Sequence, residues 1–399
     1  IKQALKYLKY EEFLKFQLTM QYIKISRKKN IGVKKNFDQK ILEQFIKKLP
    51  FKLTDDQMKA VDEVINDLKK DTTMYRFIQG DVGSGKTVVG AIGLYANYLA
   101  GFQGAMMAPT EILVTQHYQS LIKLFKETSV NIGLLTGHLS TKEKQAIYQD
   151  LRDGKIDIIV GTHALFQEKV HYHNLGLVIT DEQHRFGVNQ RKALKEKGQK
   201  VDFMVMSATP IPRTLAISLY GDMDVSTIKT MPRGRKPVLT EVIKSHSMKP
   251  ILNKLKNYLA SGGQCYVVCP LVDESDVIDS RDATSIYEGM KAYFKNHYTV
   301  GLLHGKMDDE TKEKTMDDFK ANRIQILVST TVIEVGVDVS NANWIVIYNA
   351  ERFGLSQLHQ LRGRVGRGHE QGYCYLLSNS SSKEAIERLE FLKNCHDGF

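Results

Sequence analysis

The first 50 residues combine a helical period of apolar side chains with many lysines. From residue 2 to residue 25 the chain has neither glycine nor proline, and apolar residues recur at near-helical intervals. These residues are Leu5, Leu8, Phe13, Phe16, Met20 and Ile23. The pattern predicts a long amphipathic helix, a basic loop over residues 26–35 and a second helix over residues 37–48, with a boundary at Leu49-Pro50.

From residue 51 onward, short runs rich in valine and isoleucine alternate with amphipathic segments, which is typical of a parallel sheet covered by helices. The first series predicts strands at residues 76–78, 104–108, 131–135, 157–160, 177–179 and 202–206. After a linker at residues 231–237, a second series predicts strands at residues 264–270, 299–303, 324–329, 344–349 and 372–377. We therefore predict an α/β chain of two lobes, which could share a fold, behind a basic helical segment. We place Trp344 in the core of the second lobe.

Length and composition narrow the class of protein. A chain of 399 residues is too long for one ordinary core, and 42% hydrophobic residues with a mean hydropathy of −0.30 predict a soluble globular protein. Since no apolar run approaches the ~18 residues that span a bilayer, and the start lacks the core of a signal peptide, we expect a cytoplasmic protein with no membrane partner. The four cysteines have the spacing of neither a zinc site nor a disulfide framework, so we expect reduced thiols.

The positive charge is concentrated at the start of the chain. Residues 1–50 contain 13 Lys plus Arg and 4 Asp plus Glu, a balance of +9 that leaves only +2 for the other 349 residues. A polyanionic partner such as nucleic acid would explain this concentration of positive charge. The alternative is that the lysines form a solvated helix face with no partner.

A phosphate-binding loop lies between the first predicted strand and a helix-like run. Its sequence is Gly80-Asp81-Val82-Gly83-Ser84-Gly85-Lys86-Thr87. Glycines let backbone N–H groups turn toward phosphates, a lysine places a charge on the β- and γ-phosphates, and a threonine hydroxyl reaches Mg²⁺. The chain is therefore predicted to bind a nucleoside triphosphate, the alternative being a glycine-rich turn without a ligand.

A carboxylate pair follows another predicted strand, at Asp181 and Glu182. The carboxyl ends of parallel strands are where such sheets place their ligands. We expect Asp181 to hold Mg²⁺ through water and Glu182 to polarise the attacking water. Taken alone the pair would be a surface turn, and the phosphate loop before it favours the catalytic interpretation.

The second lobe contains an arginine-rich stretch from Gln360 to Gly368. Phosphoryl transfer needs positive charge at the γ-phosphate, which Arg364 and Arg367, three residues apart, could supply. The alternative is a nucleic-acid-binding loop rich in arginine and glycine.

In this order, the Gly-Ser-Gly-Lys-Thr, Asp-Glu-Gln-His, Ser-Ala-Thr and Gln-x3-Arg-x2-Arg strings resemble superfamily 2 helicases and translocases. More narrowly, the chain resembles the RecG family. The strings that carry this resemblance are Ala108-Pro109-Thr110-Glu111, Gly161-Thr162-His163-Ala164, Asp181-Glu182-Gln183-His184-Arg185-Phe186-Gly187-Val188 and Ser207-Ala208-Thr209-Pro210. The resemblance implies two tandem RecA-like lobes that use ATP and Mg²⁺.

The resemblance also implies roles for single residues. The implied catalytic residues are Lys86, Asp181, Glu182, Gln360, Arg364 and Arg367. The implied nucleotide-binding residues are Gln57, which would read the adenine edge, the phosphate loop, and Asp338 near the ribose. Metal binding is implied for Thr87 and Asp181. The implied DNA-strand contacts are Thr110, Glu111, Gly137, Thr162, His163, Thr330 and Thr331, whereas Ser207 and Thr209 would couple the nucleotide to the grip on DNA.

The resemblance also divides the chain. It implies a basic helical connector over residues 1–50, an ATP-binding lobe over residues 51–230, a second lobe over residues 231–380 and the start of a truncated segment over residues 381–399. RecG proteins begin with a wedge domain and continue into a helical hairpin, and this chain would contain neither.

The function implied is an ATP-dependent translocase on duplex DNA that remodels branched DNA, such as stalled forks and Holliday junctions, in recombination and repair. Single-strand DNA-binding protein is an implied partner at forks, and the resemblance favours a monomer in the bacterial cytoplasm, associated with the nucleoid. Three alternatives stay open: a transcription-repair coupling translocase, an RNA helicase, and a nucleotide-gated binding module without turnover.

Overall fold

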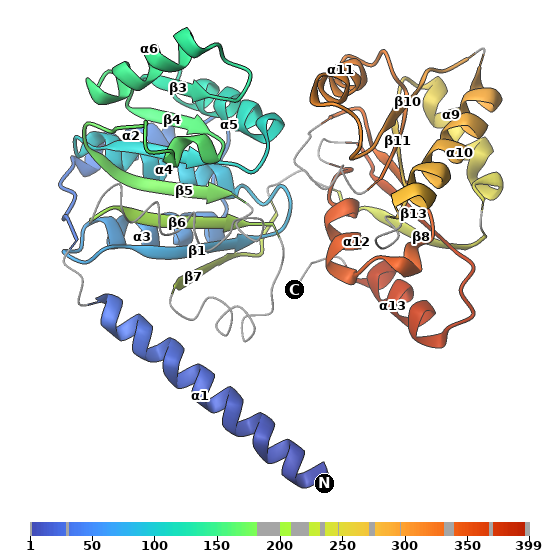
Figure 1. The fold of residues 1–399 in the computed structure, drawn as a ribbon, viewed down its shortest axis with the longest axis horizontal. Coiled ribbons are helices and arrows are strands. Elements are labelled where there is room, and N and C mark those ends of the chain that lie inside the picture. Colours follow the sequence, from blue (N-terminus) through green and yellow to red (C-terminus); the bar gives the residue numbers. More distant parts are fainter. Residues whose placement is uncertain are drawn as a thin grey trace. The chain divides into compact units, whose positions relative to one another are not determined.

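The computed structural model describes residues 2–28, 32–181, 200–208, 223–231, 236–245, 247–270, 276–295, 297–330, 339–366 and 370–395. The chain separates into two compact units, Ile1–Pro232 and Arg233–Gly398. We call them the first and the second lobe and describe each by itself (Figure 1).

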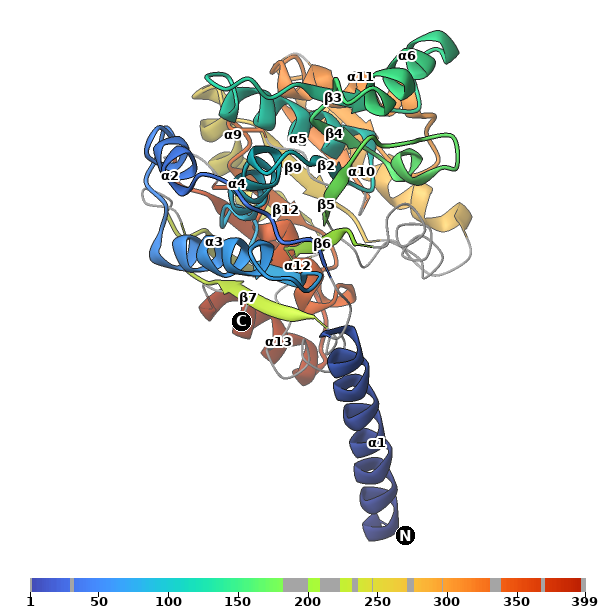
Figure 2. The same ribbon diagram turned by 90° about the vertical axis from the view of Figure 1, so that its left-hand side faces the viewer.

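Residues 1–50, which we call the basic leader, contain two helices in their described part, as predicted. Helix α1 (Lys2–Lys28) is one continuous helix (Figures 1 and 2). Several of its apolar side chains are exposed, among them Leu5, Tyr7, Phe13 and Tyr22. Helix α2 (Gln39–Lys47) begins after Asp38, whose carboxylate accepts a hydrogen bond from the Lys40 backbone N–H at 2.8 Å.

A buried ion pair attaches the segment between these helices to the first lobe. Lys35 Nζ pairs with the Asp202 carboxylate and donates to the Gly176 carbonyl oxygen at 3.1 Å. Both charged side chains are almost fully buried. Asp202 also accepts from the Met74 backbone N–H at 2.6 Å. The segment predicted as a basic loop therefore includes a structural anchor.

The first lobe is built on a parallel sheet. Within its described residues the strand order is β3-β4-β2-β5-β6-β1-β7, and every pairing is parallel. The strands are β1 (Tyr75–Gly80), β2 (Gln103–Met107), β3 (Ile132–Leu135), β4 (Ile158–Gly161), β5 (Leu175–Asp181), β6 (Asp202–Ser207) and β7 (Asp224–Ile228). The helices are α3 (Asp55–Leu68), α4 (Lys86–Leu99), α5 (Glu111–Leu124), α6 (Thr141–Arg152) and the short η1 (His163–Phe166). Helix α4 lies close to the sheet, because a Cβ at Gly90 would come within 3.3 Å of side chains of both β5 and β6.

The second lobe repeats this plan. Its described strands form a parallel sheet in the order β10-β11-β9-β12-β13-β8. The strands are β8 (Leu239–Lys244), β9 (Cys265–Val268), β10 (Val300–Leu303), β11 (Ile326–Ser329), β12 (Trp344–Ile347) and β13 (Tyr373–Ser378). The helices are α9 (Leu252–Ala260), α10 (Asp276–Phe294), α11 (Asp309–Lys320), α12 (Leu355–Arg362), α13 (Lys383–Asn394) and the short η3 (Lys249–Ile251) and η5 (Ala350–Arg352). Strands β8 to β13 take the places that β1 to β6 take in the first lobe, so the prediction of two α/β lobes is confirmed.

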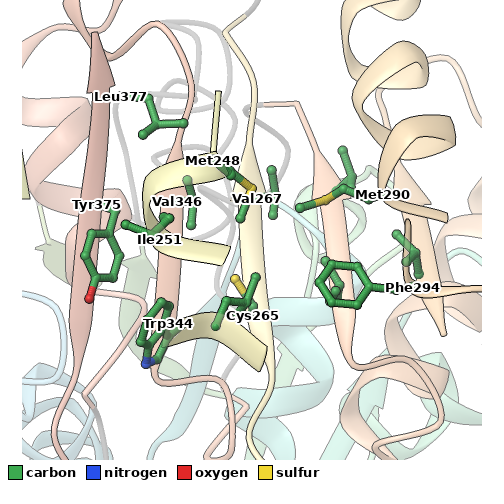
Figure 3. Close-up of a cluster of buried hydrophobic side chains, with 14 of the residues drawn as sticks. Met248, Ile251, Cys265, Val267, Met290, Phe294, Trp344, Val346, Tyr375 and Leu377 are labelled. Carbon is green, nitrogen blue, oxygen red and sulfur yellow. The ribbon is translucent and has the colours of Figure 1, made fainter. Parts of the chain in front are cut away.

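The core of the second lobe lies between its sheet and its covering helices. Trp344, 4% exposed, belongs to a cluster that includes Cys265, Val267 and Tyr375 (Figure 3). The prediction that this tryptophan is a core residue is confirmed. The four cysteines are free thiols, and burial raises the pKa of Cys374 to about 12.

Two strands were missed by the sequence pattern. Strands β7 and β8 are each at an edge of their sheet and are only partly buried. An edge strand with polar side chains lacks the continuous apolar run by which central strands are recognised. Part of the predicted linker, residues 232–235, lies outside the described residues. No helix in the described part of the chain has both the length and the hydrophobicity needed to cross a membrane.

Candidate functional site

The phosphate loop joins the carboxyl end of β1 to the first residue of α4. Gly83 and Gly85 have φ values of +77° and +85°, in the left-handed region that favours glycine. A Cβ at Gly85 would also collide with the amide of Gln57, and one at Gly80 with the hydroxyl of Ser84. The glycines are thus required by backbone geometry and by close packing, before any ligand is considered.

Lys86 folds back over its own loop. Its ammonium group donates to the carbonyl oxygens of Gly80 and Asp81, both at 2.8 Å, and the residue is 8% exposed. Ser84 is fully buried, whereas Thr87 is partly exposed at the second position of α4. Backbone N–H groups at the start of the 14-residue helix α4 favour an anion here. The arrangement therefore holds a positive charge beside a helix N-terminus at the point where phosphates would lie.

Gln57 is bound to the phosphate loop. Its side-chain oxygen accepts from the Thr54 backbone N–H at 2.9 Å, completing a capping box at the start of α3. Its amide nitrogen donates to the Ser84 carbonyl oxygen at 2.7 Å. The residue predicted to read adenine thus connects α3 to the loop, and it is 3% exposed.

Three neighbouring strands bring the other nucleotide-site residues to the same edge. Asp181 is the last residue of β5 and is aligned with Met206, whereas Ser207 ends β6 and is aligned with Gln79. Asp181 is 9% exposed and Ser207 is 4% exposed. Since the order is β5-β6-β1, these residues lie beside the phosphate loop, as expected from the rule for parallel sheets.

A histidine that the sequence analysis did not select contacts this group. His117 Nε2, on α5, lies 2.8 Å from Asp181 Oδ2, and His117 is 7% exposed. The available signal was a polar residue on the apolar helical face formed by Leu113, Val114 and Leu121. A buried histidine in such a stripe needs a partner, but the sequence does not say which.

The other half of the sheet edge collects the residues predicted to contact DNA. Thr110 follows β2, Gly137 follows β3, and Thr162 and His163 follow β4, and these three strands are adjacent in the sheet. Thr162 is buried, whereas Gly137 and His163 are exposed. The residues predicted to bind the nucleotide therefore lie at the carboxyl ends of β5, β6 and β1, and those predicted to contact DNA lie at the carboxyl ends of β3, β4 and β2.

Glu111 ties two of these segments together. Its carboxylate accepts from the backbone N–H of Gly137 and lies 2.9 Å from His138 Nε2. Lys144 donates to the Gly137 carbonyl oxygen at 2.6 Å. A Cβ at Gly137 would come 2.6 Å from the Glu111 carboxylate, so the glycine permits this contact. The role of Glu111 in this structure is to hold the turn after β3.

The second lobe places its predicted residues on two elements. Thr330 follows β11 and is 2% exposed, in the place that Thr162 takes after β4. Gln360 lies on α12, and Arg364 follows that helix with 6% exposure. Arg362, which was not predicted, donates from Nη1 to the carbonyl oxygens of Leu392 and Cys395, both at 2.7 Å, and so binds the end of α13.

Some predicted residues lie outside the described residues. They are Glu182, Thr209, Thr331, Asp338 and Arg367.

Metal ligands are sparse in the part of the chain that the structure describes. It contains no cluster of three or more His, Cys, Asp and Glu residues that could hold a metal ion. Mg²⁺ in nucleotide sites usually keeps several waters and is held by one or two carboxylates together with substrate phosphates. Thr87, the last residue of the phosphate loop, and Asp181, at the end of β5, are of the types that fit that donor set.

Two family models match the chain. The DEAD/DEAH box helicase model matches residues 54–217, and the helicase conserved C-terminal domain model matches residues 250–369. They fall on the first and the second lobe respectively.

Similar proteins are found among curated sequences and solved structures. The ATP-dependent DNA helicase RecG of Bacillus subtilis is 49% identical over all of this chain, which covers 59% of the relative. That of Thermotoga maritima is 48% identical over all of this chain, which covers 51% of the relative. The chain thus spans between half and three-fifths of these proteins.

A solved structure of RecG bound to a three-way DNA junction superposes with a TM-score of 0.87 and 46% identity, covering all of this chain and 52% of that one. Yeast Dbp5 bound to RNA and ADP BeF3 superposes with a TM-score of 0.66 at 18% identity, covering 90% of this chain and 91% of that one. The second match shows a shared fold alone.

Proposed function

Because the chain belongs to the RecG family of helicases, we propose that it is the motor of an ATP-dependent translocase that moves on duplex DNA and remodels branched DNA. The observation that carries the proposal is the divided edge of the first sheet. One half presents a phosphate loop with a lysine and a carboxylate, and the other presents three adjacent turns that contain the residues predicted from the resemblance to contact a DNA strand.

We infer that ATP binds with its phosphates in the Gly80–Thr87 loop. Lys86 would exchange its two carbonyl contacts for the β- and γ-phosphate oxygens, which supply a stronger, charge-assisted interaction. Thr87 and Asp181 would hold Mg²⁺, which when bound neutralises the charge that develops on the phosphates. Gln57 would keep α3 attached to the loop while its remaining amide hydrogen faces the base.

The hydrolytic roles rest on the sequence pattern and the family. We propose that Glu182 orients the attacking water and that Arg364 and Arg367 stabilise charge at the γ-phosphate. Gln360 would help to order the water, and Asp338 would bind the ribose. Binding a nucleotide without turnover would need neither an acidic Glu182 nor the two arginines.

The DNA contacts are proposed for turns at equivalent edges of the two sheets. Thr110, Thr162 and His163 in the first lobe and Thr330 and Thr331 in the second would contact DNA phosphates. The contribution of Glu111 and Gly137 would be indirect, through the turn that their hydrogen bond holds in place. Single-strand DNA-binding protein as a partner, a monomeric state and a cytoplasmic, nucleoid-associated location stay predictions.

The test is the rate of ATP hydrolysis by this chain alone, with forked DNA, with linear duplex DNA and with RNA. We expect stimulation by DNA and not by RNA. Glu182→Gln should bind ATP and lose ~10²–10⁴-fold in rate, the usual contribution of a general base. Phosphate release that RNA stimulates more than DNA would contradict the proposed substrate, and no release under any condition would favour the binding module.

A further inference from the structure

One buried hydrogen bond joins the two halves of the carboxyl edge of the first sheet. It links helix α5, which follows β2, to the end of β5. His117 Nε2 and Asp181 Oδ2 are 2.8 Å apart, and both residues are at least nine-tenths buried. An ionised carboxylate can only accept, so the ring nitrogen that faces it must carry a hydrogen. With Asp181 ionised, as a metal-binding carboxylate must be, His117 donates from Nε2 to the carboxylate at the end of β5.

We propose that His117 is a positioning residue for Asp181: its Nε2–H fixes the carboxylate in the orientation that serves the Mg²⁺ of the bound nucleotide and ties it to helix α5. The inference rests on the proposed function, since Asp181 must serve the metal. Partners that orient a metal-binding group typically contribute ~10–100-fold to metal affinity or activity.

The composition of α5 supports a specific role for the histidine. The other buried positions of this helix are Leu113, Val114 and Leu121, so a leucine at position 117 would continue the apolar face. Burying a polar ring there costs free energy unless it gains a hydrogen bond, and Asp181 provides that bond. The position thus gives up apolar packing for a contact with one carboxylate oxygen.

The same helix begins in the half of the edge assigned to DNA. Thr110 caps α5 by accepting from the Leu113 backbone N–H at 3.4 Å, and Glu111, its first residue, holds the turn at Gly137. With a rise of ~1.5 Å per residue, His117 lies about 9 Å along the helix from Glu111. A shift of α5 on DNA binding would therefore displace the Asp181 carboxylate through a single rigid element.

Binding of a fluorescent, non-hydrolysable ATP analogue, titrated with Mg²⁺ in the absence of turnover, tests the proposal. The variants are His117→Leu, which fills the apolar face without a donor, and His117→Gln, whose amide nitrogen can replace Nε2. His171→Leu makes the same chemical change at an exposed histidine of the first lobe and is the control. We expect His117→Leu to raise the half-saturating Mg²⁺ concentration about tenfold, and His117→Gln to restore most of it.

The tie to α5 is tested by the ratio of ATPase rates with and without duplex DNA at saturating Mg²⁺. We expect this ratio to fall in His117→Leu and to recover in His117→Gln, and an unchanged ratio would overturn the tie. Should His117→Leu fail to fold, His117→Asn replaces it, because its shorter amide stops at the level of Nδ1. If the wild-type chain binds no nucleotide, the proposed function fails. If it binds and the donor-deficient variant needs no more Mg²⁺, only the inference is overturned.

Discussion

The two lobes share one strand order, but only the first has a phosphate loop. Strands β1 and β8 occupy the same place in their sheets. Strand β1 leads into a loop with three glycines and Lys86, whereas residues 245–251 after β8 contain a proline and no glycine. Glycine is the residue that adopts, without strain, the positive φ angles that point several N–H groups at one anion. The shared scaffold therefore supplies a sheet edge, and the sequence of the loop decides whether that edge has the backbone geometry of a phosphate site.

The lobes also share a structural device at the start of a central strand. Gln103, at the start of β2, donates to the carbonyl oxygens of Leu151 and Ile156, near the end of the crossover that joins β3 to β4 through α6. Gln264, just before β9, donates to the equivalent Phe319 and Ile324 carbonyl oxygens at 2.6 and 2.7 Å. In each lobe the glutamine side chain binds both ends of the turn that follows a helix, α6 in the first lobe and α11 in the second. A buried polar side chain is therefore part of the repeated fold.

The largest expected effect is the loss of ATP hydrolysis when the phosphate loop, which the second lobe lacks after β8, is altered. Lys86→Ala should reduce ATP hydrolysis to background, since it removes the charge at the β- and γ-phosphates. Lys249→Ala, at the first residue of the short helix η3 that follows β8, is the matched control and should hydrolyse ATP like the wild type. Phosphate release and nucleotide binding are measured for both. Equal reductions in the two variants would mean that the second lobe also binds the phosphates.

The next largest effect tests whether the second lobe contributes to chemistry. Arg364→Ala should lower the single-turnover rate ~10³-fold with little change in nucleotide affinity, because an arginine finger acts mainly in the transition state. Arg352→Ala, an exposed arginine of the same lobe, is the control. As Arg364 is buried, the fluorescence of Trp344 during thermal unfolding checks that the lobe is folded. A parallel reduction of binding and rate would indicate a ground-state contact instead.

The buried ion pair between Lys35 and Asp202 belongs to the first lobe and is expected to affect its stability. Lys35→Met should lower the free energy of unfolding by ~3–5 kcal/mol at neutral pH, since it leaves the Asp202 carboxylate buried without a cation. Burial raises the pKa of Asp202 and Lys35 opposes that rise, so the pKa is higher still in the variant. A carboxyl whose folded pKa is raised destabilises the fold above that pKa and ceases to do so once protonated. The deficit should therefore shrink as the pH falls toward ~4, and a deficit independent of pH would show that poorer packing, not charge, is responsible.

A smaller effect compares the two glutamines. Gln103 also accepts from the backbone N–H groups of His173 and Asn174, whereas Gln264 Oε1 has no hydrogen-bond partner among the described residues. At ~1 kcal/mol for each net hydrogen bond, Gln103→Leu should destabilise more than Gln264→Leu, by about 2 kcal/mol. Chemical unfolding of the two variants measures this difference. Equal destabilisation would mean that the two accepted hydrogen bonds contribute nothing.

The smallest effect concerns the basic leader. Deleting residues 1–28 keeps the Lys35 anchor and removes seven Lys plus Arg against two Glu. We expect weaker binding of forked and linear duplex alike and a flatter dependence on salt, by about one unit of slope for each phosphate that the deleted helix neutralises. Fluorescence anisotropy over a salt series measures both. A preference of the undeleted chain for forks above about tenfold, ~1.4 kcal/mol, would show that the lobes recognise the branch.

Local features of this protein could be predicted from its sequence. The phosphate loop and the helix over Lys2–Lys28 are contiguous segments whose glycine pattern or apolar period fixes the local backbone. The central strands were found because burial on both faces makes them continuously apolar, and β7 and β8 were missed because edge strands are not. A period of apolar residues reports burial, so it fails where burial is partial.

The sequence by itself determined which segments are helices and central strands and which loop can bind phosphate, because neighbouring residues decide those features. Only the tertiary structure decided that the sheet edge is divided between β5-β6-β1 and β3-β4-β2, that His117 holds Asp181 from 64 positions away, and that Lys35 pairs with Asp202 from 167 positions away. A buried polar residue signals in the sequence that it needs a partner. Which partner it finds depends on strand order and register, and these are set by the packing of the whole sheet.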